Sequence, residues 1–333
     1  MSSPIRIRLS FLHLLAWVMS TGGTAALIYL ACLPSGVFEN RVDHEKSIRQ
    51  VSFFWAGVCS FIAFTTSQRV LHYDAESDIN ERSDIDQLLK LVDSKDELDR
   101  QRGIIYLQRV SRKGDRMTGL NLRDLNFSGA HFPDVNFKDC DLRRADFTGT
   151  NLSQANLCGA NLDGANLSRA NLTGADLSEA SLRGSVMDSV NLNDATLHGA
   201  TLDGANLSHA SIDGTNLIEA SFSDANLHGA NFHRAKLSRT KFKNANLTKA
   251  SFDGASLDNA MLDGANLENA NFEGANLMSA SLVDTNFKRT NLFQANLWKS
   301  FVGDNLKAAL LCSTTMPDGA VENRDCPKTT ETE

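Results

Sequence analysis

A large apolar residue occupies every fifth position of this chain from Leu122 to Leu297, without exception. These 36 positions hold 24 leucines, 10 phenylalanines, one methionine and one isoleucine, and 25 of the residues two places earlier are alanine. A period of five fits no α-helix, because successive positions would lie about 140° apart, and no straight strand, because they would alternate between faces. The chain must therefore turn once in each repeat.

Glycine often follows two places after the apolar residue, as at Gly164 and Gly204, and it eases a turn. The resulting coil has leucine, phenylalanine and alanine inside, and it buries them only by stacking on its neighbours. The expected core is represented by Leu122, Phe127, Leu162, Leu202, Phe232, Phe252, Phe272 and Leu297.

Runs such as Ala160-Asn161-Leu162-Asp163-Gly164 resemble the pentapeptide-repeat family, whose pattern is Ala, Asn or Asp, Leu or Phe, and two variable residues. The resemblance covers residues 120–300, and the repeat domain is expected to span residues 117–300. It implies an all-β solenoid, a right-handed quadrilateral β-helix with twenty residues in each coil. The 36 repeats then make nine coils, and stacked strands about 4.8 Å apart give a rod of roughly 43 Å.

The array ends with a slip of one residue. After Leu297 the apolar positions are Phe301, Leu306, Leu311 and Met316, which is one step of four followed by steps of five. We expect residues 301–333 to form a C-terminal cap and tail, because a deformed last coil closes the open end of the stack.

Residues 1–73 are expected to form a membrane anchor with two transmembrane helices. Residues 9–33 contain one ionisable side chain, His13, and are long enough to span a bilayer. Residues 51–66 carry no charge but reach only about 24 Å as a helix. A buried or interfacial helix is the alternative for this second segment, and a cleaved signal peptide is the alternative for the first.

The charges beside these segments bear on the compartment. Arg6 and Arg8 precede the first segment, and Arg69 follows the second. The positive-inside rule then predicts an inner or plasma membrane protein with its N-terminus and its repeat domain in the cytoplasm. A cytoplasmic repeat domain favours reduced thiols at Cys312 and Cys326, although their spacing also allows a disulfide across the cap.

Residues 74–116 predict an amphipathic helical linker that caps the first coil. Ile85, Leu88, Leu89 and Val92 share one helix face. A second helix is expected to begin at a capping box, Ser94 to Glu97, and to run to about Val110. Residues 91–113 resemble the helical lead-in of membrane-anchored pentapeptide-repeat proteins.

A rod filled with apolar side chains has no interior pocket, so we expect neither catalysis nor a cofactor. Residues twenty apart should stack on one face, which lets the outer columns be searched. No two histidines of the array have that spacing, so no stacked histidine pair is expected. One titratable column stands out: Asp213, His233, Asp253 and Glu273. It is expected to form a surface ladder, with a weak metal-binding surface enzyme as an alternative.

Other outer columns alternate in charge, as Asp163, Arg183 and Asp203 do, and predict ion-pair ladders. Charge is also uneven along the rod, which predicts a polarised docking surface for a protein partner. This candidate interaction surface consists of a basic band and a following acidic row: Arg234, Lys236, Arg239, Lys241, Lys243, Asp253, Asp258, Asp263, Glu268 and Glu273.

The leading hypothesis is therefore a non-enzymatic, membrane-anchored scaffold that presents a rigid rod to an unidentified protein. Its expected partners are that protein, the lipid bilayer and, through an open coil end, a second copy. Some pentapeptide-repeat proteins are thought to imitate duplex DNA and bind DNA gyrase, so the resemblance gives DNA mimicry as an alternative. The basic band interrupts the acidic surface that mimicry requires. The mixed charge also argues against nucleic acid as a partner.

Overall fold

The computed structural model describes residues 82–111 and 117–327. The predicted spans at 9–33 and 51–66 lie outside the described residues, as does the beginning of the predicted linker. Among the helices of the described ranges, none has the length and apolar character needed to cross a membrane.

Within the described residues, two helices precede the array: α4 (Arg82–Val92) and α5 (Glu97–Ser111). Asp96 is the N-cap of α5, because its Oδ1 accepts the backbone N–H groups of the second and third helical residues at 2.9 and 3.1 Å. The expectation that Ser94 caps this helix is wrong. The Ser94 hydroxyl accepts the N–H of Asp96 instead, at 3.1 Å, and so the helix begins later.

The crossing of α4 and α5 depends on Gly103. A Cβ atom at this position would lie 2.7 Å from both the backbone nitrogen and the Cγ2 atom of Val92, so a larger residue would push the helices apart. Helix α5 also contacts the first coil, where Arg100 donates to the Asn126 side chain at 3.2 Å. The apolar residues of α5 that are buried are Ile104, Leu107 and Val110.

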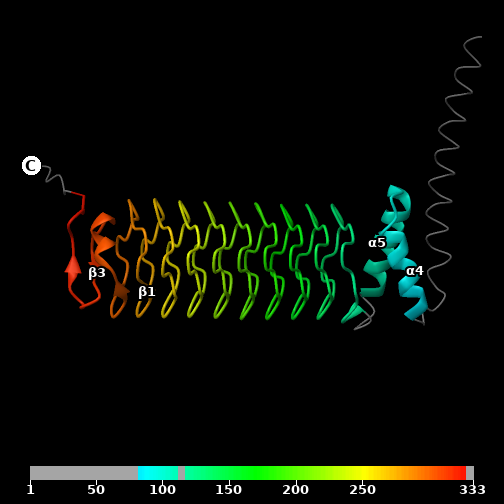
Figure 1. The fold of residues 1–333 in the computed structure, drawn as a ribbon, viewed down its shortest axis with the longest axis horizontal. Coiled ribbons are helices and arrows are strands. Elements are labelled where there is room, and N and C mark those ends of the chain that lie inside the picture. The colour runs from blue at the N-terminus through cyan, green and yellow to red at the C-terminus, as the bar shows by residue number, and fades with distance from the viewer. Residues whose placement is uncertain (1–81, 112–116, 328–333) are drawn as a thin grey trace, which may run out of the picture. The chain divides into compact units, whose positions relative to one another are not determined.

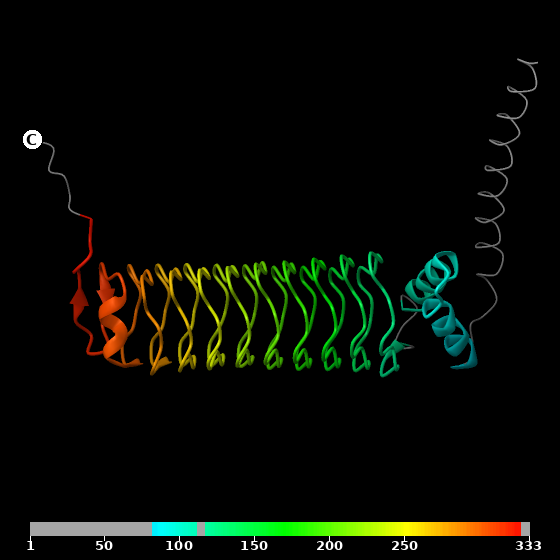
Figure 2. The ribbon, with the colours of Figure 1, turned by 45° about the horizontal axis from the view of Figure 1, so that its top comes forward.

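The array coils once every twenty residues. The residue before each inward apolar residue pairs, in parallel, with the residue twenty positions later, from Asn121 with Asp141 to Asn276 with Asn296. Four repeats therefore complete one coil, as expected, and the coils stack along the rod (Figures 1 and 2). We number the four faces by their first paired residue and every twentieth residue after it: face 1 from Asn121, face 2 from Asn126, face 3 from His131 and face 4 from Asn136.

Backbone hydrogen bonding explains why asparagine or aspartate precedes the inward leucine. In the repeat 161–165, the Oδ1 of Asn161 accepts the N–H of Asp163 at 3.1 Å. The other four N–H groups bond the carbonyl oxygens of Cys140, Ser181, Arg183 and Leu162. The side chain therefore completes the partners of a backbone that would otherwise leave one donor per repeat unused.

Four repeats with serine at this position use another arrangement. The Ser221 hydroxyl donates to Oδ1 of Asp203 at 2.5 Å, and the N–H of Ser223 donates to the same oxygen at 3.0 Å. A carboxylate or amide of the preceding coil thus replaces the missing acceptor. The other serines with this arrangement are Ser181, Ser211 and Ser281, paired with Asp163, Asn193 and Asp263.

The rod interior is closed and apolar. All eight residues named above as the expected core are fully buried, which confirms the inward position of the period. Phenylalanine rings stack between coils: the centroids of Phe232 and Phe252 are 4.6 Å apart, and those of Phe252 and Phe272 are 4.5 Å apart. Such contacts add to the burial that holds each coil on the next.

Every corner uses the left-handed backbone region. All 36 residues that lie two places after an inward apolar residue have positive φ, and 23 of them are not glycine. Glycine therefore eases the corner but is not required there. It is needed where a neighbouring side chain lies across the corner: a Cβ at Gly174 would meet the Nε2 atom of Gln154, which lies one coil earlier.

The register slip lies one repeat later than the sequence predicts. β1 (Ser281–Leu282) pairs in parallel with β2 (Phe301–Val302), and Leu282 is opposite Val302. Val302 therefore continues the inward column, and Phe301 points outward. The coil is one residue shorter at the 3₁₀ helix η3 (Asp304–Ala308). After this helix, paired residues are nineteen positions apart instead of twenty, as Asn291 and Leu310 are.

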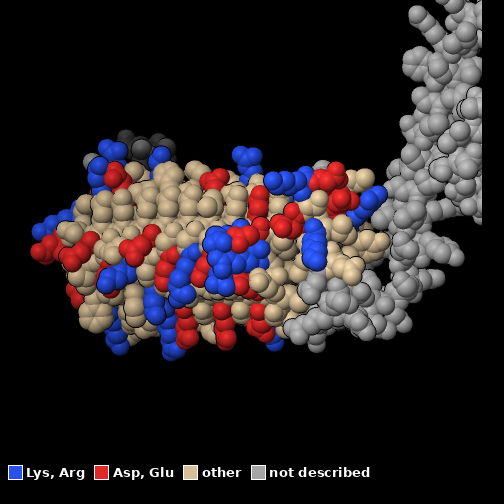
Figure 3. All heavy atoms as spheres, turned by 45° about the vertical axis from the view of Figure 1, so that its right-hand side comes forward, with Lys and Arg blue, Asp and Glu red and all other residues tan. Residues whose placement is uncertain are grey.

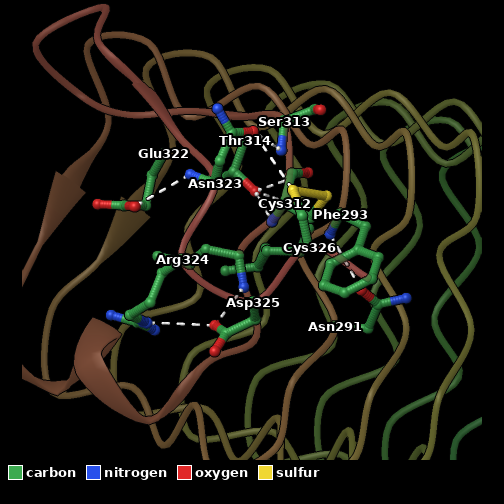
Figure 4. The surroundings of a disulfide bond; sticks show 12 residues. Asn291, Phe293, Cys312, Ser313, Thr314, Glu322, Asn323, Arg324, Asp325 and Cys326 are labelled. Atoms are coloured by element: carbon green, nitrogen blue, oxygen red, sulfur yellow. Dashed lines mark hydrogen bonds and ion pairs between the residues drawn. A yellow bond between two sulfur atoms is a disulfide. The ribbon is translucent and has the colours of Figure 1, made fainter. Parts of the chain in front are cut away.

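A hairpin closes the C-terminal end. β3 (Thr314–Thr315) continues face 4 and pairs in antiparallel fashion with β4 (Val321–Glu322). A disulfide joins Cys312 to Cys326, so the expectation of reduced thiols is wrong (Figure 4). The chain after β4 folds back along the segment before β3, which places the two cysteines side by side.

Candidate interaction surfaces

A shallow, open depression of about 400 Å³ lies near the C-terminal end of the rod. It lies where η3 shifts the register, and its lining combines the carboxylates of Asp284 and Asp304 with the ammonium group of Lys307. Two acids and a lysine around an open hollow do not converge on one reacting atom, and no catalytic constellation follows from them.

The titratable column of face 3 divides into separate pairs. His233 Nδ1 lies 3.1 Å from Asp253 Oδ2, and Arg234 contacts the Asp213 carboxylate at 3.4 Å. Within the described residues, no three histidine, cysteine, aspartate or glutamate side chains come close enough to hold a metal ion. The metal-binding alternative therefore has no geometric support.

One histidine pair does form, against the expectation from twenty-residue spacing. The rings of His209 and His228, nineteen residues apart, meet edge to face with centroids 5.4 Å apart. The His209 ring lies over Gly229, where a Cβ would be 2.9 Å from its Nδ1. A search for residues twenty apart misses this contact, because His209 lies at a corner and its side chain extends over Gly229 to the next coil.

Some of the columns of alternating charge form ion pairs between coils, and others do not. Glu219 and Arg239, which are twenty residues apart on face 4, form an ion pair at 3.1 Å. Asp163 and Arg183 are linked differently, since the carboxylate accepts the backbone N–H of Arg183 at 2.9 Å. The closest ladder is Arg144 with Asp124, joined by two bonds of 2.6 and 2.7 Å, which hold the pKa of Asp124 below its ordinary value. These exposed pairs serve register more than stability.

The candidate interaction surface does not form one patch. Its basic residues occupy a single coil but lie on faces 3, 4 and 1, and its acidic row advances by one face at each step. Residues that are neighbours in a five-residue period thus point to different sides. Figure 3 shows acidic and basic side chains beside one another on the visible face, next to a lengthwise strip with few charges.

Net charge is instead concentrated on face 3. Its outward positions carry one base, Arg234, and five acids, whereas each of the other faces carries both signs in nearly equal number. The five acids of face 3 are Asp134, Asp194, Asp213, Asp253 and Glu273.

Exposed large apolar residues gather at the C-terminal coils, which the sequence reasoning missed. Met261, Val283, Trp298 and Phe301 are 46, 44, 42 and 67% exposed. Met261 and Phe301 lie in one column of face 1, with Ser281 between them. Indexing the sequence by twenty would have revealed this cluster.

The remaining cysteines within the described residues do not form a reactive centre. Cys140 takes an inward position, and burial raises the pKa of its thiol to about 11. Cys158 is half-buried on face 4, and burial raises its pKa as well. Both thiols are therefore protonated at neutral pH, which makes them poor nucleophiles.

The model of the pentapeptide repeats family matches the chain in eight copies, along the array from residue 116 to residue 299. The matched stretches include 116–149, 150–188, 191–229, 205–244, 225–262, 240–277 and 260–299. No curated protein matches the chain.

Several solved structures are similar. HetL, a pentapeptide repeat protein involved in heterocyst differentiation regulation from the cyanobacterium Nostoc sp. strain PCC 7120, is 29% identical; the match covers 65% of this chain and 98% of HetL, with a TM-score of 0.33. QnrB1, a plasmid-mediated fluoroquinolone resistance protein, is 18% identical over 54% of this chain and 87% of its own, with a TM-score of 0.41. A pentapeptide repeat protein from the Arabidopsis thaliana thylakoid lumen is 29% identical over 45% and 73%, with a TM-score of 0.22.

Proposed function

Because this chain belongs to the pentapeptide-repeat family, we propose that it is a non-enzymatic scaffold, anchored in a membrane by its N-terminal segments, whose rod contacts a protein partner. The closed apolar interior carries this proposal. Leucine, phenylalanine and alanine fill the rod, and many of its polar side chains bond to their own coil or to a neighbouring coil. Such an object offers flat faces and rigidity rather than a reaction site.

Face 3 is the proposed protein-binding face. Five acidic side chains and one basic one favour a partner with a basic surface, since complementary potentials select partners and speed their encounter. This assignment replaces the sequence-derived surface, whose ten residues lie on all four sides.

Site-specific photo-crosslinking in cells tests this assignment. A photo-reactive residue at Asn271 of face 3 should capture a protein, whereas the same residue at Asn266 of face 2, in the same coil, should not. Equal capture at both positions, or capture only from face 2, would contradict the choice of face 3. No capture from any face would remove the scaffold proposal.

DNA mimicry is less well supported. Duplex DNA carries phosphates along both strands, whereas the acids of this rod are unbalanced on one face alone. If purified residues 81–333 inhibited or protected gyrase in a supercoiling measurement, mimicry would replace the scaffold proposal.

The compartment proposed for the rod is an oxidising one. The disulfide between Cys312 and Cys326 supports this side of the membrane, because cytoplasmic thiols are kept reduced. A single span at residues 9–33, with the N-terminal arginines in the cytoplasm, would deliver the rod there, whereas two spans would return it to the cytoplasm.

Reporter fusions test this topology. Reporters after Leu71 and after Glu333 should both be active on the exported side, and Cys312 and Cys326 should resist alkylation until a reductant is added. Reporters active in the cytoplasm would contradict the single span, while the membrane anchor itself is tested separately by extraction of the full chain from membranes.

A further inference from the structure

A convex apolar ridge runs along the edge between face 4 and face 1 in the last coils. Trp298 lies on face 4 and Phe301 follows it on face 1, across one corner of the rod. Met261 lies on the same edge two coils before Phe301, and Val283 lies across face 1, next to its edge with face 2. Of the eight exposed large apolar residues in the described part of the chain, six lie between Met261 and Val321. Isolated surface apolar residues need no explanation, but a group on one edge does.

Four lysine side chains adjoin this ridge. Lys241 and Lys243 are exposed on face 1, and Lys236 is exposed on the neighbouring face 4. Within the described residues, none of these three lysines forms an ion pair. Lys299 adds a further cation, with its Nζ 4.2 Å from the centre of the Trp298 ring.

Two of the nearby acids accept hydrogen bonds from the coil, whereas Asp284, next to Val283, is exposed. Asp258 accepts the hydroxyls of Ser238 and Ser256 at 2.6 and 3.0 Å. Asp263 accepts the N–H of Val283 at 3.0 Å. Their carboxylates are therefore held against the coil, whereas the lysine side chains remain free to contact a ligand.

We propose that this ridge, formed by Met261, Val283, Trp298, Phe301 and the flanking lysines, binds the surface of an anionic lipid bilayer. Tryptophan and phenylalanine suit the bilayer interface, and lysines beside them attract anionic headgroups. The ridge favours a bilayer over a peptide, because a peptide anchor needs a groove, and none of the four apolar ridge residues lines the depression beside η3. The inference rests on the proposed function only in taking a bilayer to lie near the rod. Face 3, on the side opposite face 1, would then point away from the lipid.

The protein supplies its own probe. Its three tryptophans are Trp17, Trp55 and Trp298, so residues 81–333 retain Trp298 alone. These residues form one compact unit with the core and both caps, and they lack the predicted anchor segments. Vesicle binding by this fragment therefore reports on the ridge and not on the anchor.

The experiment compares phosphatidylcholine vesicles with vesicles that also contain phosphatidylglycerol. With the anionic vesicles, we expect the fragment to co-sediment, the Trp298 emission to move to shorter wavelength and its quenching by acrylamide to fall. Phe301→Ser combined with Met261→Ser should weaken binding at least tenfold, and so should Lys241→Gln combined with Lys243→Gln. The matched controls on face 2, Val186→Ser and Lys249→Gln, should bind like the unchanged fragment.

Three results would overturn the proposal. The first is no binding to anionic vesicles. The second is binding that the face 2 controls weaken as much as the ridge variants do. The third is a shift of the Trp298 emission in the absence of lipid. If polyglutamate causes it, the ridge binds an acidic chain; if self-association seen in sedimentation causes it, the ridge binds a second copy. Each of these leaves the anchoring of the full chain untouched, since extraction from membranes measures that separately.

Discussion

At the scale of single residues, the residue type before the inward leucine depends on which group accepts the backbone N–H one place after that leucine. Asparagine or aspartate before the inward leucine accepts it within the repeat, and a serine in that place transfers the task to the preceding coil. The inward period and the expected core follow from apolar spacing alone. This second rule does not, because it links residues eighteen and twenty apart that become neighbours only in the coil.

Replacement of Asp203 by alanine tests that rule. The change leaves the Ser221 hydroxyl and the Ser223 N–H without their acceptor, and we expect it to lower the free energy of unfolding by about 1–2 kcal/mol. Adding Ser221→Asn should restore most of the loss, since asparagine accepts the N–H within its own repeat. Urea denaturation of both variants measures this, and an unrescued double variant would disprove the exchange of acceptors.

Ser300 breaks the pattern of inward polar residues. Its hydroxyl is buried and has no hydrogen-bond partner, whereas the Ser185 hydroxyl, also inward, donates to the carbonyl of Leu182 at 2.8 Å. Because an unpaired buried hydroxyl costs about 1–3 kcal/mol, Ser300→Ala should stabilise the protein by about 1 kcal/mol. Ser185→Ala should be neutral or destabilising. Thermal unfolding of the pair checks this, and the same direction of change in both would contradict it.

At the scale of elements, the ends of the rod are where the sequence misleads. The capping-box pattern predicts Ser94 as the N-cap of α5, but the N-cap is Asp96. The apolar spacing predicts an inward Phe301, but Val302 is the inward residue. In the first case the side chain two residues later supplies the cap, and in the second the pairing with β1 sets which residue is inward. Inside the array every repeat has the same neighbours, so local pattern and tertiary contact agree.

The disulfide should contribute strongly to the stability of the C-terminal cap. Cys312 and Cys326 close a loop with a sequence separation of 14, for which about 3 kcal/mol is typical. Cys326→Ser should therefore release the hairpin before the rod unfolds. Trp298 fluorescence in residues 81–333 provides the readout, because Gly319 of the hairpin lies beside that ring. If reductant changes the unfolding of Cys326→Ser as much as that of the unchanged fragment, the disulfide is not the cause.

Acid should loosen the same cap. The N–H of Leu311 donates to the Asp325 carboxylate at 3.0 Å, and Arg324 lies beside it, so the pKa of Asp325 is below its ordinary value. A carboxyl whose pKa is lower in the folded state stabilises the fold above its unfolded value of about 3.9, and this contribution is lost as pH falls through the lower folded value. We expect the Trp298 signal of the cap to change below about pH 4, and Asp325→Asn to flatten that dependence. An unchanged acid transition in Asp325→Asn would assign it to other carboxylates.

At the scale of the whole molecule, the rod is a one-dimensional stack whose stability is transmitted only between adjacent coils. Its two ends differ from its middle, since α5 covers the first coil and the hairpin covers the last. The stacked rings of Phe232, Phe252 and Phe272 strengthen the C-terminal half. A scaffold of this kind keeps its faces at fixed distances, which is what separate lipid and protein contacts on opposite sides require.

Removal of the C-terminal cap should turn the rod into a self-associating one. Ending the chain at Ser300 removes β2, η3 and the hairpin, and it leaves the N–H groups and carbonyls of the last coil without the partners that residues 301–317 supply. An open strand edge pairs with another, so we expect end-to-end assembly that grows with protein concentration. Light scattering of the truncated and complete forms of residues 81–333 measures it.

Because the removed segment lies at one end, the remaining coils should keep their β signal in circular dichroism. If the truncated rod stayed monomeric with that signal intact, the cap would not be what limits the stack; if the signal vanished, the last coil would depend on the cap for folding itself.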